Sequence, residues 1–104
     1  MKAIINGKRY DTDKAILVGE AGSGLSRSDF GWWEAGLYKT PRSGAFFLAG
    51  QGGPMTRWAE SVGNMRSGGE GIHPLDREEA LKWVERYLDT ATVEEHFGDM
   101  IEDA

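Results

Sequence analysis

The sequence of 104 residues contains no cysteine, which excludes disulfide bridges and thiolate metal sites. That composition suits a reducing cytosol. No apolar run approaches the roughly 20 residues that a membrane-spanning helix needs. The first ten residues, MKAIINGKRY, carry charges where a signal peptide has its apolar stretch, and we expect no such peptide.

Histidine is scarce, and the sequence motifs of common enzymes are missing. Only His73 and His96 occur, without H-E-x-x-H spacing, so we expect no zinc site. Gly19, Gly22 and Gly24 follow an expected strand, but the spacing is not G-x-G-x-x-G and no G-K-[ST] ending follows. No G-x-S-x-G elbow occurs either. We therefore expect no cofactor, no metal and no catalytic residue.

Charge is present in quantity but unevenly distributed. The net charge is −5. Residues 1–73 hold nine Lys/Arg and seven Asp/Glu, a net of +2, whereas residues 74–104 hold three Lys/Arg and ten Asp/Glu, a net of −7. The acidic third repels phosphate, which argues against simple DNA binding. It could attract a basic groove on another protein, or be only a solvated pair of helices.

The length predicts one domain, residues 1–104, with a single core. Asn6-Gly7, between apolar and β-prone residues, predicts a tight hairpin with a type I′ turn. The apolar run 15–19 is typical of a buried strand, and the Gly/Ser-rich stretch 19–29 of a loop.

A second hairpin is expected from residues 30–39 and 45–50, joined by the turn 40–44. Pro41 presets a type I turn, and Gly44 suits a left-handed position after it. Side chains alternate along a strand, which gives two faces. One face takes Trp33, Ala35 and Leu37, and the other takes Phe30, Trp32 and Tyr38. Phe46 and Phe47 must point opposite ways, and the sequence leaves open which joins which face.

The glycine-rich segment 50–71 contains a stretch, 55–62, that could form a helical turn or lie on the sheet. Residues 72–75 predict an edge strand, since Pro74 cannot donate to a ladder. Asp76 with Glu79 predicts the capping box of a helix. Its apolar arc is Ala80, Leu81, Trp83, Val84, Tyr87 and Leu88. Thr92 with Glu95 predicts a second helix with the stripe Val93, Phe97, Met100 and Ile101, and Gly98 favours an early end.

These elements predict an α+β fold: a small antiparallel sheet of hairpins, five strands in all, with one or two C-terminal amphipathic helices packed on one face. The second face is then either covered by residues 50–71 or left as an exposed aromatic patch. Such a patch could bind a partner protein or form a homodimer interface. Glu34 lies among aromatic residues, where burial would raise its pKa, although we prefer an outward orientation.

The whole chain resembles a family of short proteins carried by bacterial phages, plasmids and integrated elements. The resemblance lies in the segments INGKRYDTDKA, WWEAGLYKTPRSGAFFLAGQGG, SVGN with GGEGIHPL, and EEALKWVERYLD with VEEHFGD. Some relatives are anti-CRISPR proteins, small inhibitors of CRISPR effector complexes. The resemblance implies a location in the bacterial cytoplasm, a protein partner, no cofactor and no reaction. It carries over no functional residues.

We therefore expect an anti-CRISPR-like inhibitor that blocks nucleic-acid binding or cleavage by a CRISPR effector complex through an acidic and aromatic surface. The candidate partner-binding residues are Phe30, Trp32, Tyr38, Arg42, Glu94, Glu95, Asp99 and Glu102. The alternative is a small regulatory nucleic-acid-binding protein that uses loop arginines, namely Arg9, Arg27, Arg42, Arg57 and Arg66. An enzyme that modifies the effector is a third possibility.

Overall fold

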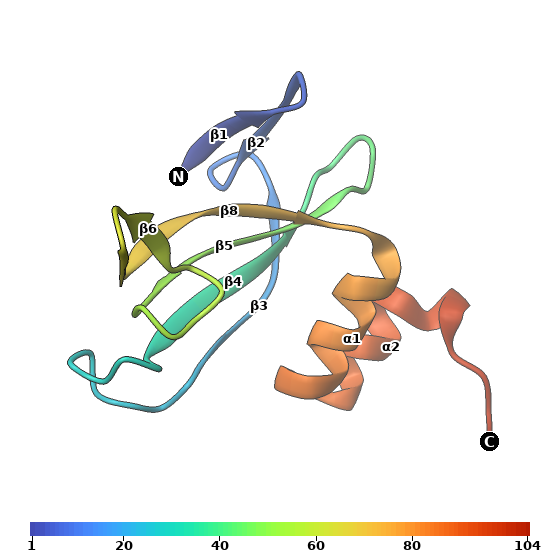
Figure 1. Ribbon diagram of the computed structural model, residues 1–104. Coiled ribbons are helices and arrows are strands. Elements are labelled where there is room, and N and C mark those ends of the chain that lie inside the picture. The colour runs from blue at the N-terminus through green and yellow to red at the C-terminus, as the bar shows by residue number, and fades with distance from the viewer.

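A computed structural model describes all 104 residues and confirms the α+β class. A four-stranded antiparallel sheet lies between two C-terminal helices and an N-terminal hairpin (Figure 1). The sheet order is β3 (Ile16–Gly22), β4 (Trp33–Lys39), β5 (Phe46–Gly52) and β8 (Gly69–Leu75). The helices are α1 (Arg77–Tyr87) and α2 (Thr90–Phe97), followed by a 3-10 turn, Gly98–Met100. Two further hairpins are β1 (Lys2–Ile5) with β2 (Lys8–Asp11), and β6 (Glu60–Val62) with β7 (Met65–Ser67).

Local turn chemistry places two of the hairpins as expected. Asn6 and Gly7 have φ values of 52° and 76°, as a type I′ turn requires between β1 and β2. Gly44 has φ 68° at the end of the turn that joins β4 to β5. Its N–H donates to the carbonyl of Thr40 at 3.1 Å, which closes that turn.

The β4–β5 register settles the position of the two adjacent phenylalanines. Leu37 pairs with Leu48, and Tyr38 pairs with Phe47. Directly paired residues share a face of the sheet. Phe46, Leu37 and Leu48 therefore point to the helices, whereas Phe47 and Tyr38 point to the N-terminal hairpin, where their rings stack at 5.4 Å.

The N-terminal hairpin packs on the second face of the sheet, so neither alternative, cover by residues 50–71 or an exposed aromatic patch, is correct. Tyr10 of β2 is buried against Phe47 and Ile72. Its ring meets Phe47 edge-on, with centroids 5.4 Å apart. The sheet thus has apolar contacts on both faces, with helices on one and β1–β2 on the other (Figure 1).

The expected aromatic face of Phe30, Trp32 and Tyr38 is wrong, because β4 begins only at Trp33. The side chain of Asp29 accepts from the N–H of Gly31 at 2.8 Å, and Trp32 donates to the carbonyl of Asp29 at 3.1 Å. These bonds bend the chain, so Phe30 and Trp32 belong to a loop and only Tyr38 lies on the sheet.

The expected buried strand 15–19 is also wrong in its burial and length. β3 extends to Gly22, so part of the stretch 19–29 is strand and not loop. It is the edge of the sheet, and Ile16 and Leu17 are about half exposed. The predicted edge strand 72–75 is confirmed, since β8 forms the opposite edge.

Both helices are capped by aspartate. Asp76 and Glu79 form the predicted capping box of α1. The predicted cap of α2 at Thr92 is wrong: Asp89 caps the helix and accepts from the N–H of Thr92 at 2.9 Å. α2 ends at Phe97, next to Gly98 as expected, so Ile101 lies beyond the helix.

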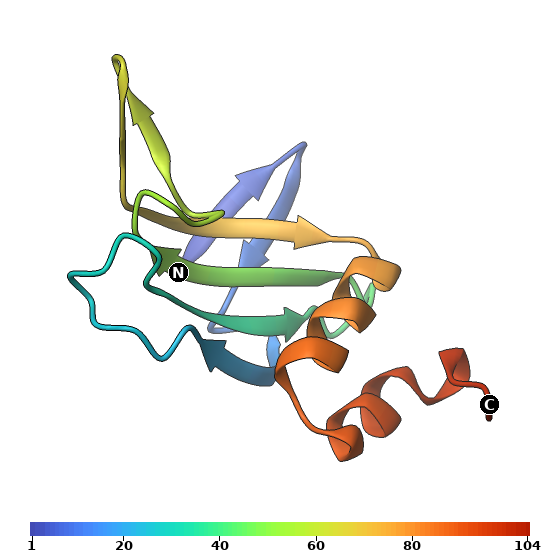
Figure 2. The ribbon, with the colours of Figure 1, turned by 60° about the horizontal axis from the view of Figure 1, so that its bottom comes forward.

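Of the two alternatives for the segment 55–62, a helical turn or a stretch lying on the sheet, the structure has no helix there and places the middle of the segment on the sheet. Trp58 enters the core on the helix side of the sheet. Residues 60–67 then form the separate β6–β7 hairpin, which projects from the sheet (Figure 2). The chain therefore has eight strands where five were predicted.

Phe97 holds α2 on the sheet, because it is fully buried and its ring stacks on Phe46 at 5.0 Å. Phe97→Ala should lower the free energy of unfolding by about 3–5 kcal/mol. Ile101→Ala, at a half-exposed position, is the control and should change it by less than about 0.5 kcal/mol. Urea unfolding measures both values, and equal losses would show that α2 is not docked.

Candidate functional site

The C-terminal third presents an acidic surface, defined here as the Asp and Glu side chains of residues 74–104. All ten of these residues are exposed. Asp99 alone among them pairs with an arginine, Arg77, and Glu95 Oε2 lies 3.8 Å from Nε2 of His96. The two helices carry five of the ten residues, and they lie together at one end of the molecule (Figure 2). The negative charge is therefore concentrated and mostly without ion-pair partners.

The cap of α2 contributes to this surface. Hydrogen bonds from the hydroxyl and N–H of Thr92 lower the pKa of Asp89. Those bonds measure 2.6 and 2.9 Å. Asp89 therefore stays ionised over a wider pH range than an unbonded aspartate, and it keeps the helix start fixed.

The structure divides the eight predicted partner-binding residues among separate places. Glu94, Glu95, Asp99 and Glu102 all belong to the acidic surface. Arg42 lies in the exposed turn between β4 and β5. Tyr38 lies partly buried on the second face, where burial first, then the charges of Glu20 and Asp13, raise its pKa. Phe30 and Trp32 lie in the loop before β4. The acidic residues are thus brought together, whereas the aromatic ones are not.

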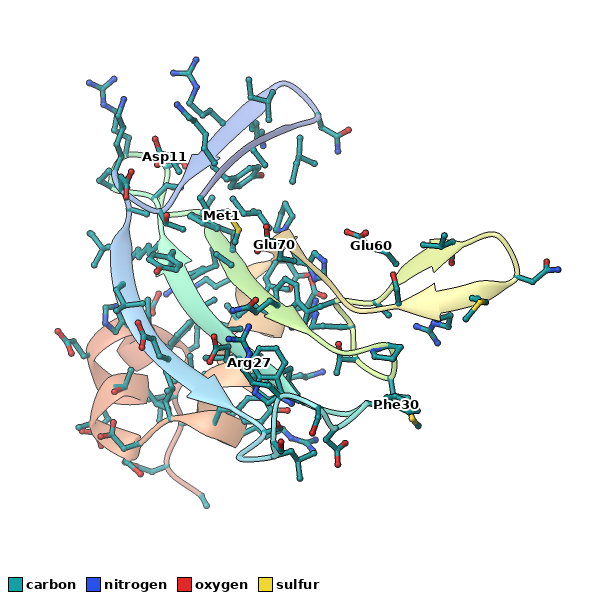
Figure 3. The ribbon with its side chains drawn as sticks, turned by 90° about the vertical axis from the view of Figure 1, so that its left-hand side faces the viewer. Met1, Asp11, Arg27, Phe30, Glu60 and Glu70 are labelled. Carbon is teal, nitrogen blue, oxygen red and sulfur yellow. The ribbon has the colours of Figure 1, made fainter.

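A loop cluster of exposed apolar side chains lies away from the N-terminal hairpin (Figure 3). We define it as Leu25, Phe30 and Met55, which are 49%, 65% and 75% exposed. The N–H of Met55 donates to the carbonyl of Phe30 at 2.9 Å. Gly53 permits this approach, since a Cβ there would lie 2.6 Å from the carbonyl oxygen of Phe30. This hydrogen bond joins the loop before β4 to the loop after β5, so the apolar side chains are exposed in a fixed arrangement.

An arginine–aromatic pair lies in the first of these loops. The guanidinium carbon of Arg27 lies 4.8 Å from the centroid of the Trp32 ring. This distance is within the range of a cation–π contact.

A groove of about 530 Å³ opens on the second face of the sheet, beside the N-terminal hairpin. Glu20, Glu34 and Glu70 line it, and Met1 and Thr12 contribute from the hairpin side. Figure 3 labels Met1 and Glu70. Gln51 lies between Glu34 and Glu70 in the strand register and donates to Glu34 at 2.8 Å. Glu34 is exposed, in agreement with its preferred outward orientation.

No local sequence pattern predicts this groove. Its three glutamates lie on three different strands, and only the register of β3, β4, β5 and β8 brings them to one face. Once the strand pairing is known, three carboxylates on one face beside small residues such as Gly36 indicate the groove.

Arg57, Trp58 and His73 form a compact stack on the helix side of the sheet. The Trp58 and His73 rings are nearly parallel, with centroids 4.2 Å apart. Nε of Arg57 donates to Nδ1 of His73 at 3.1 Å, which requires a neutral imidazole. Burial, reinforced by the charge of Arg57, lowers the pKa of His73. His73 therefore acts as an acceptor that positions Arg57.

Comparison with protein-family models, with curated proteins and with solved structures found no match to this chain. No helix combines the length and apolar character needed to cross a membrane. No three His, Asp or Glu side chains come together in a group that could hold a metal ion. The resemblance to mobile-element proteins thus rests on the sequence segments alone.

The lowered pKa of His73 predicts a pH dependence of stability. The unfolded chain takes up a proton near pH 6.5, whereas the folded chain resists it, so the stabilising contribution is complete above that pH and is lost as the pH falls through the lowered pKa. Unfolding measured between about pH 5 and 7 should therefore show declining stability toward acid. His73→Gln should flatten this decline, and an unchanged slope in the variant would contradict the assignment.

Proposed function

We propose that the protein is a non-catalytic inhibitor that binds a bacterial CRISPR effector complex and blocks its access to nucleic acid. The observation that carries the proposal is the acidic surface, whose ten residues are all exposed and include one ion pair with arginine. A nucleic-acid channel is lined by Lys and Arg, so a compact surface with net charge −7 over residues 74–104 complements it.

Two physical features support binding by charge at this surface. Five of the ten carboxylates lie on two helices that are capped and packed on the sheet, so the backbone that carries them needs little ordering on binding. The opposing charge of a basic channel also accelerates encounter, and this effect weakens with salt. We expect the association rate to fall as ionic strength rises.

The loop cluster supports a second contact. Exposed apolar side chains held by backbone hydrogen bonds are typical of interface anchors. Phe30 and Met55 are of the types enriched at the centre of interfaces. The acidic surface attracts the basic channel of the partner. Phe30 and Met55 add apolar contacts if the partner also covers the loop cluster.

Charge reversal tests the acidic surface directly. Glu94→Lys, Glu95→Lys and Glu102→Lys together should weaken binding to a purified effector complex at least about tenfold, because they replace attraction by repulsion. Asp99 is left unchanged, since its pairing with Arg77 has a structural role. Co-elution and DNA-binding suppression measure the effect across a panel of effector types.

The matched control changes the same total charge elsewhere. Asp13→Lys, Glu60→Lys and Glu70→Lys lie outside the acidic surface and should leave the affinity nearly unchanged. Circular dichroism confirms the fold of both triple variants. Equal weakening by the two sets, or no binding by the unaltered protein to any effector in the panel, would contradict the proposal.

The Arg27–Trp32 contact favours one alternative, a small regulatory nucleic-acid-binding protein. A guanidinium over an indole ring beside the exposed Phe30 has the elements of a base-stacking platform. This alternative predicts a mobility shift with RNA or DNA that weakens steeply with salt, and the Glu94/Glu95/Glu102 reversal strengthens it. Absence of binding at low salt eliminates the alternative.

A further inference from the structure

A cavity of about 300 Å³ lies on the helix side of the sheet, between α1 and the loop that follows β5. Figure 2 faces this side of the sheet. We call it the aromatic pocket, because the rings of Trp33, Trp58, Trp83 and Tyr87 line it. The remaining lining residues are Gly31, Ala35, Met55, Thr56 and Arg57, with no carboxylate among them. The pocket is separate from the acidic surface, and the inference below does not depend on the proposed function.

Contacts among three of the rings set the shape of the pocket. Tyr87 meets Trp33 edge-on, with centroids 5.0 Å apart, and it lies 5.1 Å from Trp83. Trp83 and Tyr87 are four positions apart in α1, so they project from the same side of the helix. The wall is thus built from β4 and α1, and both elements are held by the main core.

Trp58 forms part of the pocket wall, and it carries an unpaired hydrogen-bond donor. Its side chain is 3% exposed, and its Nε1 is buried without any acceptor. A buried indole N–H normally finds a partner, and leaving it unpaired destabilises the fold. Nε1 itself is covered, so Trp58 contributes ring carbons to the pocket wall, and its N–H signal reports on changes around that ring.

Positive charge accompanies the donor. Arg57 lines the pocket, and its guanidinium carbon lies 5.8 Å from the centroid of Trp58. Its Nε bonds to His73, whereas its two terminal nitrogens make no hydrogen bond or ion pair within the fold. Arg86 places a second guanidinium 5.4 Å from the centroid of Tyr87. The positive charges of Arg57 and Arg86 repel a cationic ligand, although aromatic rings without them would attract one through cation–π contacts.

We propose that the aromatic pocket binds a small aromatic carboxylate. The ring of the ligand packs among Trp33, Trp83 and Tyr87, and its carboxylate accepts from the terminal nitrogens of Arg57. The volume is at the lower end of the range of small-molecule sites, which fits one ring system and not a nucleotide. His73 is a positioning residue, because its bond to Nε leaves the far end of the guanidinium free.

Phenylacetate is the probe, and the indole N–H signals of the ¹⁵N-labelled protein are the readout. A ligand this small has a dissociation constant in the millimolar range, so the titration extends to about 10 mM. Trp58→Phe identifies the Trp58 signal, and through-bond correlation from the ring through Cβ to the assigned backbone identifies it independently if that variant does not fold. We expect the Trp58 signal to shift saturably with phenylacetate.

Two matched compounds separate the contributions of ring and charge. Benzylamine has the same ring with a positive charge, and acetate has the carboxylate without a ring. Both should bind at least about tenfold more weakly than phenylacetate. Arg57→Gln should weaken phenylacetate at least about tenfold, whereas Arg66→Gln, on β7, should not.

Three results would overturn the inference. One is a Trp58 signal that does not move at the highest phenylacetate concentration. Another is benzylamine or acetate binding as tightly as phenylacetate. The third is an Arg57→Gln variant that retains full affinity, because the carboxylate would then have no role in binding.

Discussion

The register between β4 and β5 is the constraint on which the rest of the fold depends. Pairing Leu37 with Leu48 and Tyr38 with Phe47 sends neighbouring aromatic and aliphatic side chains to opposite faces. The apolar side chains on one face are then buried by the helices, and those on the other face are buried by the N-terminal hairpin. A shift of one residue would turn Phe47 and Phe46 to the wrong layers and leave Phe97 and Tyr10 without their ring contacts.

Both faces of the sheet carry packed layers, and the candidate binding surfaces lie beside those layers. The acidic surface lies at the helical end, and the loop cluster and aromatic pocket lie where loops meet the sheet and α1. The helices therefore have two roles. Their inner sides complete the core through Trp83, Val84 and Phe97, and their outer sides concentrate negative charge. The capping aspartates, Asp76 and Asp89, contribute to both roles: they cap the helices, and they add to the negative charge.

The sequence predicted those features that depend on a few adjacent residues. Asn6-Gly7, Gly44 and the Asp76–Glu79 box each fix a turn or helix start by local geometry, and the structure confirms them. The fold class follows from the order of such segments.

Features that depend on distant contacts escaped prediction. The start of β4 depends on Trp33 bonding to Ser23, so Phe30 was misplaced on the sheet. The cover of the second face depends on Tyr10 reaching Phe47. The glutamate-lined groove and the aromatic pocket each combine residues from three or more segments, and no local pattern marks such combinations. The acidic surface was foreseen because it lies within one stretch of chain.

Hydrogen exchange of the protein, alone and with a CRISPR effector complex, tests the central claim most directly: that the acidic surface is the part of the molecule covered by its partner. The account predicts added protection of backbone amides in α1, α2 and the residues after them, and little change in β1 and β2. Failure to form a complex, or a complex whose added protection lies entirely outside residues 76–104, would contradict it.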